Sequence, residues 1–196
     1  MKRRSLGPCV TFFPQPTTLI GSRDADGRDD LMTASWAGIV SKTPPTLGVS
    51  LNKGRQTYQN IRHSGEFTVS VVPERLMAAA DFCGLASGRD VDKFERTGLT
   101  PEKSERVAAP LVAEAPLCVE CRVAGEVELG DYRLVLGEIL DIRVAEEVFD
   151  GEGRIDPAAF APLVYLGGVR EYWGLGGKVG NAYRDGREFF AESEES

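Results

Sequence analysis

Two long strand-forming stretches in the middle of the chain constrain the fold more than any other feature. Residues 117–129 and 132–145 are rich in strand-forming side chains, and only Gly130 and Asp131 separate them. A glycine at the first position of a two-residue connection is what a type II′ hairpin requires. Gly137 interrupts the second stretch and predicts a bulge at which a sheet can curve. Long antiparallel strands with few helices predict a β-barrel.

Turn residues divide the first part of the chain into shorter strands. Asp24 to Gly27 and the pair Pro44-Pro45 both favour turns. The strands predicted around them are residues 17–22, 31–40 and 46–51. Further on, Phe67, Val69 and Val71 alternate with polar residues, as in a strand with one buried face. This succession of strands and turns is typical of a meandering antiparallel sheet.

Two short helices and one long loop complete the predicted architecture. Residues 56–63 form a helix that Gly65 ends, and residues 76–83 form a second helix that Gly84 ends. Residues 86–116 have no long periodic segment, so we expect a loop excursion over the core. The fold class is therefore mainly β, with a few short helices and a long loop excursion.

Composition limits the classes of function. With 196 residues, 42% hydrophobic and 27% charged, the chain fits one domain, residues 1–196, whose acidic end at about 185–196 is expected to fray. A net charge of −7 argues against nucleic-acid binding, which needs a basic face. The sequence shows neither a secretory signal nor a membrane span. Four cysteines without a signal predict reduced thiols and a cytoplasmic location.

Two motifs that could carry chemistry are better explained as structural. Cys118 and Cys121 have the spacing of a redox or zinc pair, but residues three apart in a strand point to opposite faces. His63 is the single histidine, and beside Gly65 it is expected in the last turn of a helix, with a cofactor contact as the alternative. Without a second histidine, a second cysteine pair or a GxSxG elbow, neither a zinc site nor a catalytic triad is predicted.

The glycine-rich stretch at residues 174–180 is a weak match to nucleotide-binding loops. Lys178 is followed by Val179, where a P-loop needs Ser or Thr. Residues 181–196 are too few to supply the rest of a dinucleotide-binding unit. By elimination, we expect a cofactor to carry any chemistry, with no side chain assigned as a catalytic acid, base or nucleophile and no metal.

Three segments could hold a cofactor that has a phosphate tail. In residues 87–94, Ser87 offers a hydroxyl, Gly88 allows close approach, and Arg89 and Lys93 supply charge beside a turn that Asp90 is expected to cap. The alternative is a capped surface turn with two solvated cations. The other two segments are residues 32–36 and 50–57, the latter a strand end followed by hydroxyl, amide and cationic groups before a helix.

Short segments spread along the chain carry a resemblance to a known family. They are residues 26–27, 31–38, 65–71, 81–84, 87–94, 98–100 and 117–121. In order and combination the chain resembles the FMN-binding split-barrel proteins of the flavin reductase-like family, and within it the flavoredoxins. The resemblance covers nearly the whole chain. It implies an antiparallel split β-barrel of the FMN-binding type.

The resemblance also implies where FMN would lie. The ring would lie along Thr33, Ala34, Ser35 and Trp36, with main-chain groups at its polar edge, and residues 50–52 would flank the ribityl chain. The implied cofactor-binding residues are Thr33, Ala34, Ser35, Trp36, Ser50, Leu51, Asn52, Arg55, Thr57, Ser87, Gly88, Lys93, Phe94 and Tyr172. Of these, Arg55, Thr57, Ser87 and Lys93 would hold the phosphate. For Trp36 and Phe94, core packing is the alternative to a ring contact.

One position departs from the relatives. Where they commonly carry Asn before the Met-Thr stretch, this chain has Asp30. A side-chain contact to the cofactor at that position is therefore not implied.

The function implied is that of an FMN-binding oxidoreductase. It would transfer electrons between NADH or NADPH and flavin or a downstream acceptor, as a homodimer with FMN near the interface. One alternative is a non-enzymatic FMN electron carrier that serves a protein redox partner. Another is a flavin-binding module without redox turnover.

Overall fold

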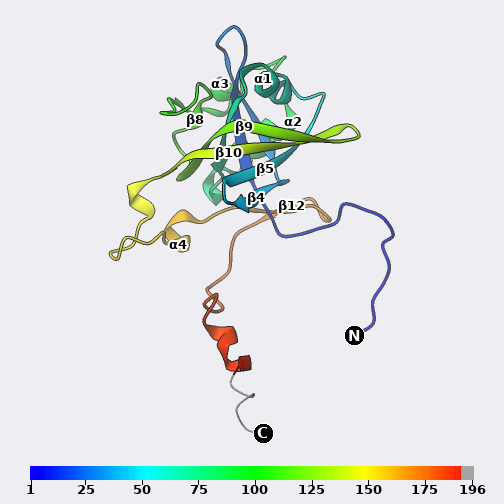
Figure 1. Cartoon of the computed structure of the whole chain (residues 1–196), viewed down its shortest axis with the longest axis vertical. Helices are drawn as coiled ribbons and strands as arrows, with labels where there is room; N and C mark the ends of the chain where they lie inside the picture. Colours follow the sequence, from blue (N-terminus) through cyan, green and yellow to red (C-terminus); the bar gives the residue numbers. More distant parts are fainter. Residues whose placement is uncertain (191–196) are drawn as a thin grey trace.

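The protein is built on one large antiparallel sheet that curls into a split barrel. The structure is a computed structural model that describes residues 1–190 (Figure 1). Seven strands form the main sheet in the order β3-β2-β6-β9-β10-β5-β4, and the strands β1-β11-β12 and β7-β8 form two small sheets. The fold class predicted from the sequence is confirmed.

The strands of the main sheet are β2 (Thr18–Arg23), β3 (Asp29–Ala34), β4 (Ala37–Lys42), β5 (Pro45–Asn52), β6 (Glu66–Val71), β9 (Leu117–Leu129) and β10 (Tyr132–Val144). The short strands are β1 (Gln15–Pro16), β7 (Pro101–Glu102), β8 (Leu111–Val112), β11 (Val164–Leu166) and β12 (Glu171–Trp173). The helices are α1 (Gln56–Ser64), α2 (Met77–Leu85), α3 (Lys93–Thr97) and α4 (Pro157–Phe160), with 3-10 turns η1 (Glu74–Leu76), η2 (Glu146–Val148) and η3 (Asp185–Phe190).

The long hairpin β9–β10 forms as predicted and crosses the body of the molecule (Figure 1). Tyr132 pairs with Leu129, so the connection has two residues, and Gly130 has a φ of +61°. That positive φ is the reason for a glycine at this position. The hairpin joins the two halves of the sheet, because β9 pairs with β6 and β10 pairs with β5.

The sheet closes on itself at a break that the sequence did not reveal. The predicted strand 31–40 is wrong as one element, because β3 ends at Ala34 and β4 begins at Ala37. These two strands are the edges of the seven-stranded sheet, yet only Ser35 and Trp36 separate them along the chain. The Ser50 backbone N–H donates to the Trp36 carbonyl at 2.9 Å. The two edges of the sheet must therefore approach each other at this link, which makes the barrel split.

Two apolar clusters lie on opposite faces of the sheet. Consecutive residues Leu19 and Ile20 are both fully buried but belong to different clusters. The inner cluster is built around Phe67, and the outer cluster lies under α2 and α3 and includes Phe94. Because successive side chains in a strand alternate between faces, the central strands are apolar on both sides. This double burial explains why helices and the 86–116 excursion cover one face.

The helices follow the predictions, except that α2 continues past Gly84 and the 86–116 excursion contains a further short helix. Helix α1 ends at Gly65, which has a φ of +71° in the left-handed region, as predicted. Helix α2 runs to Leu85, so Gly84 lies inside its last turn instead of beyond it, packed toward Thr33. The excursion at residues 86–116 contains α3 and the small hairpin β7–β8, and it covers the outer cluster as expected.

A bulge lies beside Gly137, as predicted, but the extra residue is on the partner strand. Leu136 pairs with Gly125 and Gly137 pairs with Val123, which leaves Ala124 of β9 unpaired. Gly137 has a packing role as well. A Cβ at this position would lie 2.4 Å from Cζ of Phe67 and 2.9 Å from Cβ of Cys121. The absence of a side chain at residue 137 makes room for the largest fully buried ring of the inner cluster.

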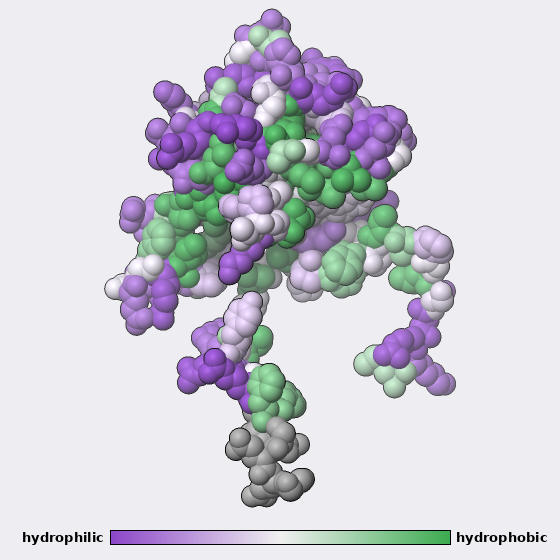
Figure 2. All heavy atoms as spheres, in the orientation of Figure 1, coloured by the Kyte–Doolittle hydropathy of each residue, from purple (hydrophilic) through white to green (hydrophobic). Residues whose placement is uncertain are grey.

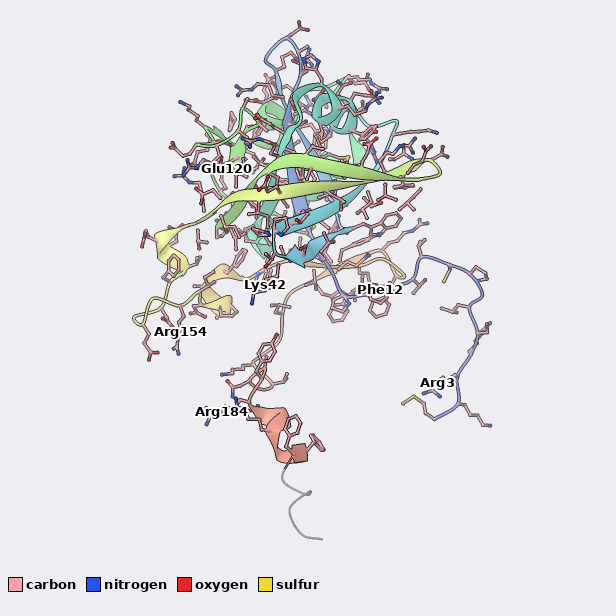
Figure 3. The ribbon with its side chains drawn as sticks, viewed as in Figure 1. Arg3, Phe12, Lys42, Glu120, Arg154 and Arg184 are labelled. Carbon is pink, nitrogen blue, oxygen red and sulfur yellow. The ribbon has the colours of Figure 1, made fainter. Side chains whose placement is uncertain are left out.

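Both ends of the described chain extend away from the barrel. Arg3 lies on the N-terminal segment and Arg184 on the segment before η3, well outside the body (Figure 3). The predicted frayed tail begins with η3, whose placed side chains are exposed, and its remainder, residues 191–196, lies outside the described residues. Among the described residues, no helix is both long and apolar enough to cross a membrane.

We expect Gly137→Ala to destabilise the protein by about 1–3 kcal/mol, because the added methyl group overpacks the site beside Phe67. Gly125→Ala is the matched control, since a Cβ there meets nothing within 4 Å. Urea unfolding of both variants measures the difference. Equal stability of the two variants would contradict the packing role of Gly137.

Candidate functional site

A cavity of about 220 Å³ lies at the split of the barrel. It is lined by Met32, Thr33, Ala34, Ser35, Trp36, Ser50, Asn52, Arg55, Tyr132 and Tyr165. Seven of the fourteen residues expected at the cofactor are in this set, namely Thr33, Ala34, Ser35, Trp36, Ser50, Asn52 and Arg55. The structure therefore brings the 32–36 and 50–57 segments together around one hollow.

The topology explains this convergence. The break between β3 and β4, the end of β5 and the start of α1 meet at the same edge of the sheet. Asn52 shapes the turn that follows β5, because its Oδ1 accepts the Gly54 N–H at 2.9 Å and its carbonyl accepts the Arg55 N–H at 3.1 Å. This turn delivers the exposed Arg55 side chain to the cavity rim, directly before the first turn of α1.

The start of α1 is open to an anion. Arg55 occupies the N-cap position with extended backbone angles, and its side chain makes no capping hydrogen bond within the described residues. The first N–H groups of a helix point outward and carry a partial positive charge. Arg55 is the one charged residue among the ten that line the cavity, so the positive charge of the lining lies at this rim.

Aromatic rings form a wall of the cavity. The rings of Trp36 and Tyr132 lie 5.2 Å apart between centroids at 43°, and Trp36 is 38% exposed. Tyr165, on β11, contacts the ring of Tyr172 at 5.4 Å, and these two tyrosines are paired across β11 and β12. Aromatic surface of this kind suits a flat ring system.

Tyr132 and Tyr165 are cavity residues that the sequence reasoning missed. Tyr132 directly follows the predicted hairpin turn, which places it at the strand end facing β5, where it pairs with Asn52. Tyr165 sits in a short strand that no periodic pattern marks. The position of Tyr132 after Gly130 and Asp131 was the available signal, and for Tyr165 there was none beyond its aromatic type.

Three further expected contact residues do not line the cavity. Leu51 is 1% exposed and points into the inner cluster, since it alternates with Ser50 and Asn52 along β5. Phe94 belongs to the outer cluster, where it packs as core. The Tyr172 hydroxyl donates to Asp81 Oδ1 at 3.0 Å, and burial, then this hydrogen bond, raises the pKa of Tyr172 to about 12. These side chains belong to the packing around the barrel and not to the cavity lining.

Thr57, Ser87 and Lys93 line neither hollow, and Gly88 borders a second, larger cleft of about 640 Å³. It is lined by Asp24, Arg28, Asp29, Asp30, Gln56, Asn60, Gly88, Arg89, Asp90, Val91 and Asp92. Arg89 closes one side, donating from Nε to Gln56 Oε1 at 3.1 Å and from Nη2 to the Gly54 carbonyl at 3.0 Å. The segments 50–57 and 87–94 therefore do meet in space.

Two of the expected phosphate residues are engaged inside the protein. The Thr57 hydroxyl donates to Asp30 Oδ2 at 2.7 Å. Lys93 is 3% exposed, and its Nζ lies 3.5 Å from Asp30 Oδ1 while it donates to the carbonyls of Leu31 and Cys83. Ser87 accepts the Arg89 N–H at 3.2 Å.

The capping residue of this segment also differs from the prediction. Asp92, and not Asp90, caps α3, accepting the Glu95 N–H at 3.0 Å. The helix that follows has only five residues. Asp92 is in the cap position because it directly precedes Lys93, the first residue of α3, and α3 is held by the buried side chains of Lys93 and Phe94.

The cysteines and the histidine are placed as structural residues. Cys118 belongs to the outer cluster and Cys121 to the inner cluster, so the pair points to opposite faces as predicted. Burial raises the pKa of Cys83 to about 11 and of Cys121 to about 12, and it also raises the pKa of Cys118. His63 is exposed in the last turn of α1. Among residues 1–190, no group of His, Cys, Asp and Glu side chains is arranged to hold a metal.

We expect one fast-reacting thiol in the folded protein when a disulfide reagent is added at pH 8. Cys9 is exposed, and hydrogen bonding with Thr11 lowers its pKa, whereas the raised pKa values of the other three keep them protonated and their burial shields them. Cys9→Ser should abolish the fast phase, and all remaining thiols should react after unfolding. Fast thiols that survive this substitution would contradict the burial of Cys83, Cys118 and Cys121.

Known proteins resemble this chain over nearly its whole length. A family model described as the flavin reductase like domain matches residues 10–174. The flavoredoxin of Desulfovibrio vulgaris (Miyazaki F) is 35% identical and superposes with a TM-score of 0.89, covering 94% of this chain and 100% of that one. The flavoredoxin from Methanosarcina acetivorans is 28% identical, with a TM-score of 0.87 and coverages of 96% and 100%.

A second kind of protein shares the fold. Nitrilotriacetate monooxygenase component B from Bacillus cereus is 26% identical, with a TM-score of 0.80, covering 87% of this chain and 89% of that one. All ten residues that line the cavity at the split fall within the range that the family model matches.

Proposed function

Because the chain belongs to the flavin reductase-like family of split-barrel proteins, we propose that it is an FMN-binding oxidoreductase of the flavin reductase and flavoredoxin type. It would transfer electrons between NADH or NADPH and flavin or a downstream acceptor. One observation carries the proposal. Residues 33–36, Ser50, Asn52 and Arg55 line a single cavity although they come from the break after β3, the end of β5 and the turn before α1.

The donor set of the cavity fits a flavin. Ser35, Ser50 and Asn52 offer polar side chains, Trp36 and Tyr132 offer aromatic surface, and Arg55 supplies a positive charge at one end. Because β3 is an edge strand of the sheet, main-chain groups along its outer side have no strand partner among the described residues. Such groups match the alternating donors and acceptors at the polar edge of a flavin ring.

In this arrangement each part of the cofactor has a counterpart. The ring would lie along residues 33–36, the ribityl chain beside Ser50 and Asn52, and the phosphate at Arg55 and the start of α1. Thr57, Ser87, Gly88 and Lys93 would then support the loops around α1 without reaching the ligand. Tyr172 would support the wall through Tyr165, and Leu51 and Phe94 would pack in the inner and outer clusters.

The bound flavin would supply the redox chemistry. The chain's own residues would bind it, orient it and exclude water from one side. The ten lining residues include no Asp, Glu, His, Lys or Cys, so proton transfer by a neighbouring side chain is not part of the proposal.

A homodimer with FMN near the interface is part of the proposal. The cavity of about 220 Å³ is smaller than the roughly 300–1,000 Å³ of most small-molecule sites, so a second surface would be needed to enclose the cofactor. Apolar side chains stand exposed on the edge strand β4, where Ile39 is 65% exposed, and on the N-terminal segment, where Phe12 is 75% exposed. In Figure 2 the N-terminal segment shows green, apolar residues among purple, polar ones. Exposed apolar surface of this extent favours association.

The proposal also covers the number of domains, the partners and the location of the protein. We propose one domain for residues 1–196, without nucleic-acid or membrane partners. The buried unpaired thiols Cys83, Cys118 and Cys121 fit a reducing, cytoplasmic compartment. A non-enzymatic electron carrier that serves a protein redox partner is the alternative function, favoured by the similarity to two flavoredoxins.

We expect Arg55→Ala to weaken FMN binding about fivefold, on the order of 1 kcal/mol, because an exposed charge-assisted contact to phosphate is lost. Riboflavin binding should not change, since riboflavin lacks the phosphate. Arg62→Ala, at the far end of the same helix, is the control. Fluorescence titration measures the affinities, and an unchanged FMN affinity in Arg55→Ala would remove Arg55 from the phosphate site.

The oxidoreductase proposal predicts that NADH or NADPH bleaches the flavin absorbance of the FMN-loaded protein in an anaerobic stopped-flow experiment. The carrier alternative predicts slow bleaching or none with either nucleotide, but normal reduction by dithionite. If the protein-bound FMN is reduced no faster than free FMN by either nucleotide, the reductase proposal is contradicted and the electron carrier remains.

A further inference from the structure

The Asp30 carboxylate stands at the junction of β3, α1 and the 87–93 loop. It is 7% exposed. Its Oδ2 accepts the Thr57 hydroxyl at 2.7 Å, and its Oδ1 lies 3.5 Å from Lys93 Nζ. The side chains of Thr57 and Lys93 are themselves almost completely buried. The Thr57 hydroxyl and the Lys93 ammonium group are therefore both engaged by Asp30.

The glycine loop also packs on this carboxylate. A Cβ on Gly88 would lie 2.2 Å from Asp30 Oδ1, so the backbone at residue 88 touches the carboxylate and leaves no room between them. A hydroxyl in the first turn of α1, an ammonium group and a glycine in close contact are the parts from which proteins build anion sites. Here all three surround an anion that belongs to the chain.

We propose that Asp30 is an internal anion that fills this site, so that the 5′-phosphate of a flavin cannot enter it and the protein distinguishes only weakly between FMN and riboflavin. The inference rests on the proposed flavin-binding function and specifies its ligand class. The phosphate is left with the exposed Arg55 rim alone. A weakly held phosphate suits a flavin that exchanges with solution.

The charge of the adjoining cleft acts in the same direction. Its lining contains five carboxylates, those of Asp24, Asp29, Asp30, Asp90 and Asp92, against the two guanidinium groups of Arg28 and Arg89. Arg23 and Lys93 pair with Asp29 and Asp30, so five carboxylates face four cations. A phosphate dianion placed in this cleft would meet net negative charge at short range, which disfavours binding. The cleft is therefore larger than the cavity at the split, but its charge makes it the less favourable phosphate site of the two.

The decisive variant is Asp30→Ala, with Asp29→Ala as its matched control. Asp29 borders the same cleft, but its carboxylate pairs with Arg23 at 2.7 Å, away from Lys93. Removing the Asp30 carboxylate frees Lys93 and Thr57 and opens space for phosphate oxygens. FMN and riboflavin affinities are measured by fluorescence titration for the wild-type protein and both variants.

In the wild-type protein we expect FMN to bind less than about tenfold more tightly than riboflavin, since one exposed contact distinguishes them. In Asp30→Ala this preference should rise at least tenfold, because a buried ammonium now meets the phosphate. Asp29→Ala should keep the wild-type ratio. Inorganic phosphate should also raise the melting temperature of Asp30→Ala more than that of Asp29→Ala.

Several results would overturn the inference. A wild-type preference for FMN of tenfold or more is one, and it decides the matter even if Asp30→Ala does not fold. An unchanged preference in folded Asp30→Ala is another. If the wild-type protein binds neither flavin, the proposed function itself fails, and this inference with it; that outcome is distinct from binding both flavins with a strong preference for FMN.

Discussion

Closure of the sheet at the Ser35–Trp36 link is the constraint on which the rest of the structure depends. The two edge strands of the seven-stranded sheet are neighbours in sequence, so the sheet must curl until its edges meet at this link. The hydrogen bond from the Ser50 N–H to the Trp36 carbonyl fixes the link against β5. As a result, the main chain of residues 33–36 borders a cavity at the split instead of pairing within a continuous sheet.

The same closure orders the surrounding elements. The end of β5 leads through the Asn52 turn into α1, and this path brings Arg55 to the cavity rim. Behind the rim, Asp30 joins β3 to α1 through Thr57 and to α3 through Lys93. Breaking one member of such a buried pair is strongly destabilising, because the other charge is left without a partner. The buried Asp30–Lys93 pair thus holds these elements together, whereas the cavity lining has a single charged residue, Arg55.

Much of this architecture follows from local sequence signals. The hairpin at Gly130, the helix end at Gly65 and the opposite orientation of Cys118 and Cys121 depend on turn chemistry and on the two-residue period of a strand. The strand break at Ser35 could not be predicted in this way, because a single serine is a weak turn signal and Gly38, the stronger one in residues 31–40, lies inside β4. It arises from barrel closure, which involves strands distant in sequence.

The candidate site shows the same division. Residues 33–36, 50 and 52 were expected from the family resemblance, and they line the cavity. The engagement of Lys93 could not be foreseen, since its partner Asp30 precedes it by 63 positions, 93 − 30, and no pattern links them. A cationic residue beside a glycine predicts anion binding, but only the fold shows that the anion is internal.

The most direct test of the central claim is a crystal structure of the protein with FMN. We expect the ring along residues 33–36 at the split, between Trp36 and a second surface, with the phosphate at Arg55 and with Asp30 still in contact with Lys93. A flavin ring bound in the cleft between α1 and residues 88–92, or a phosphate in contact with Lys93, would contradict it.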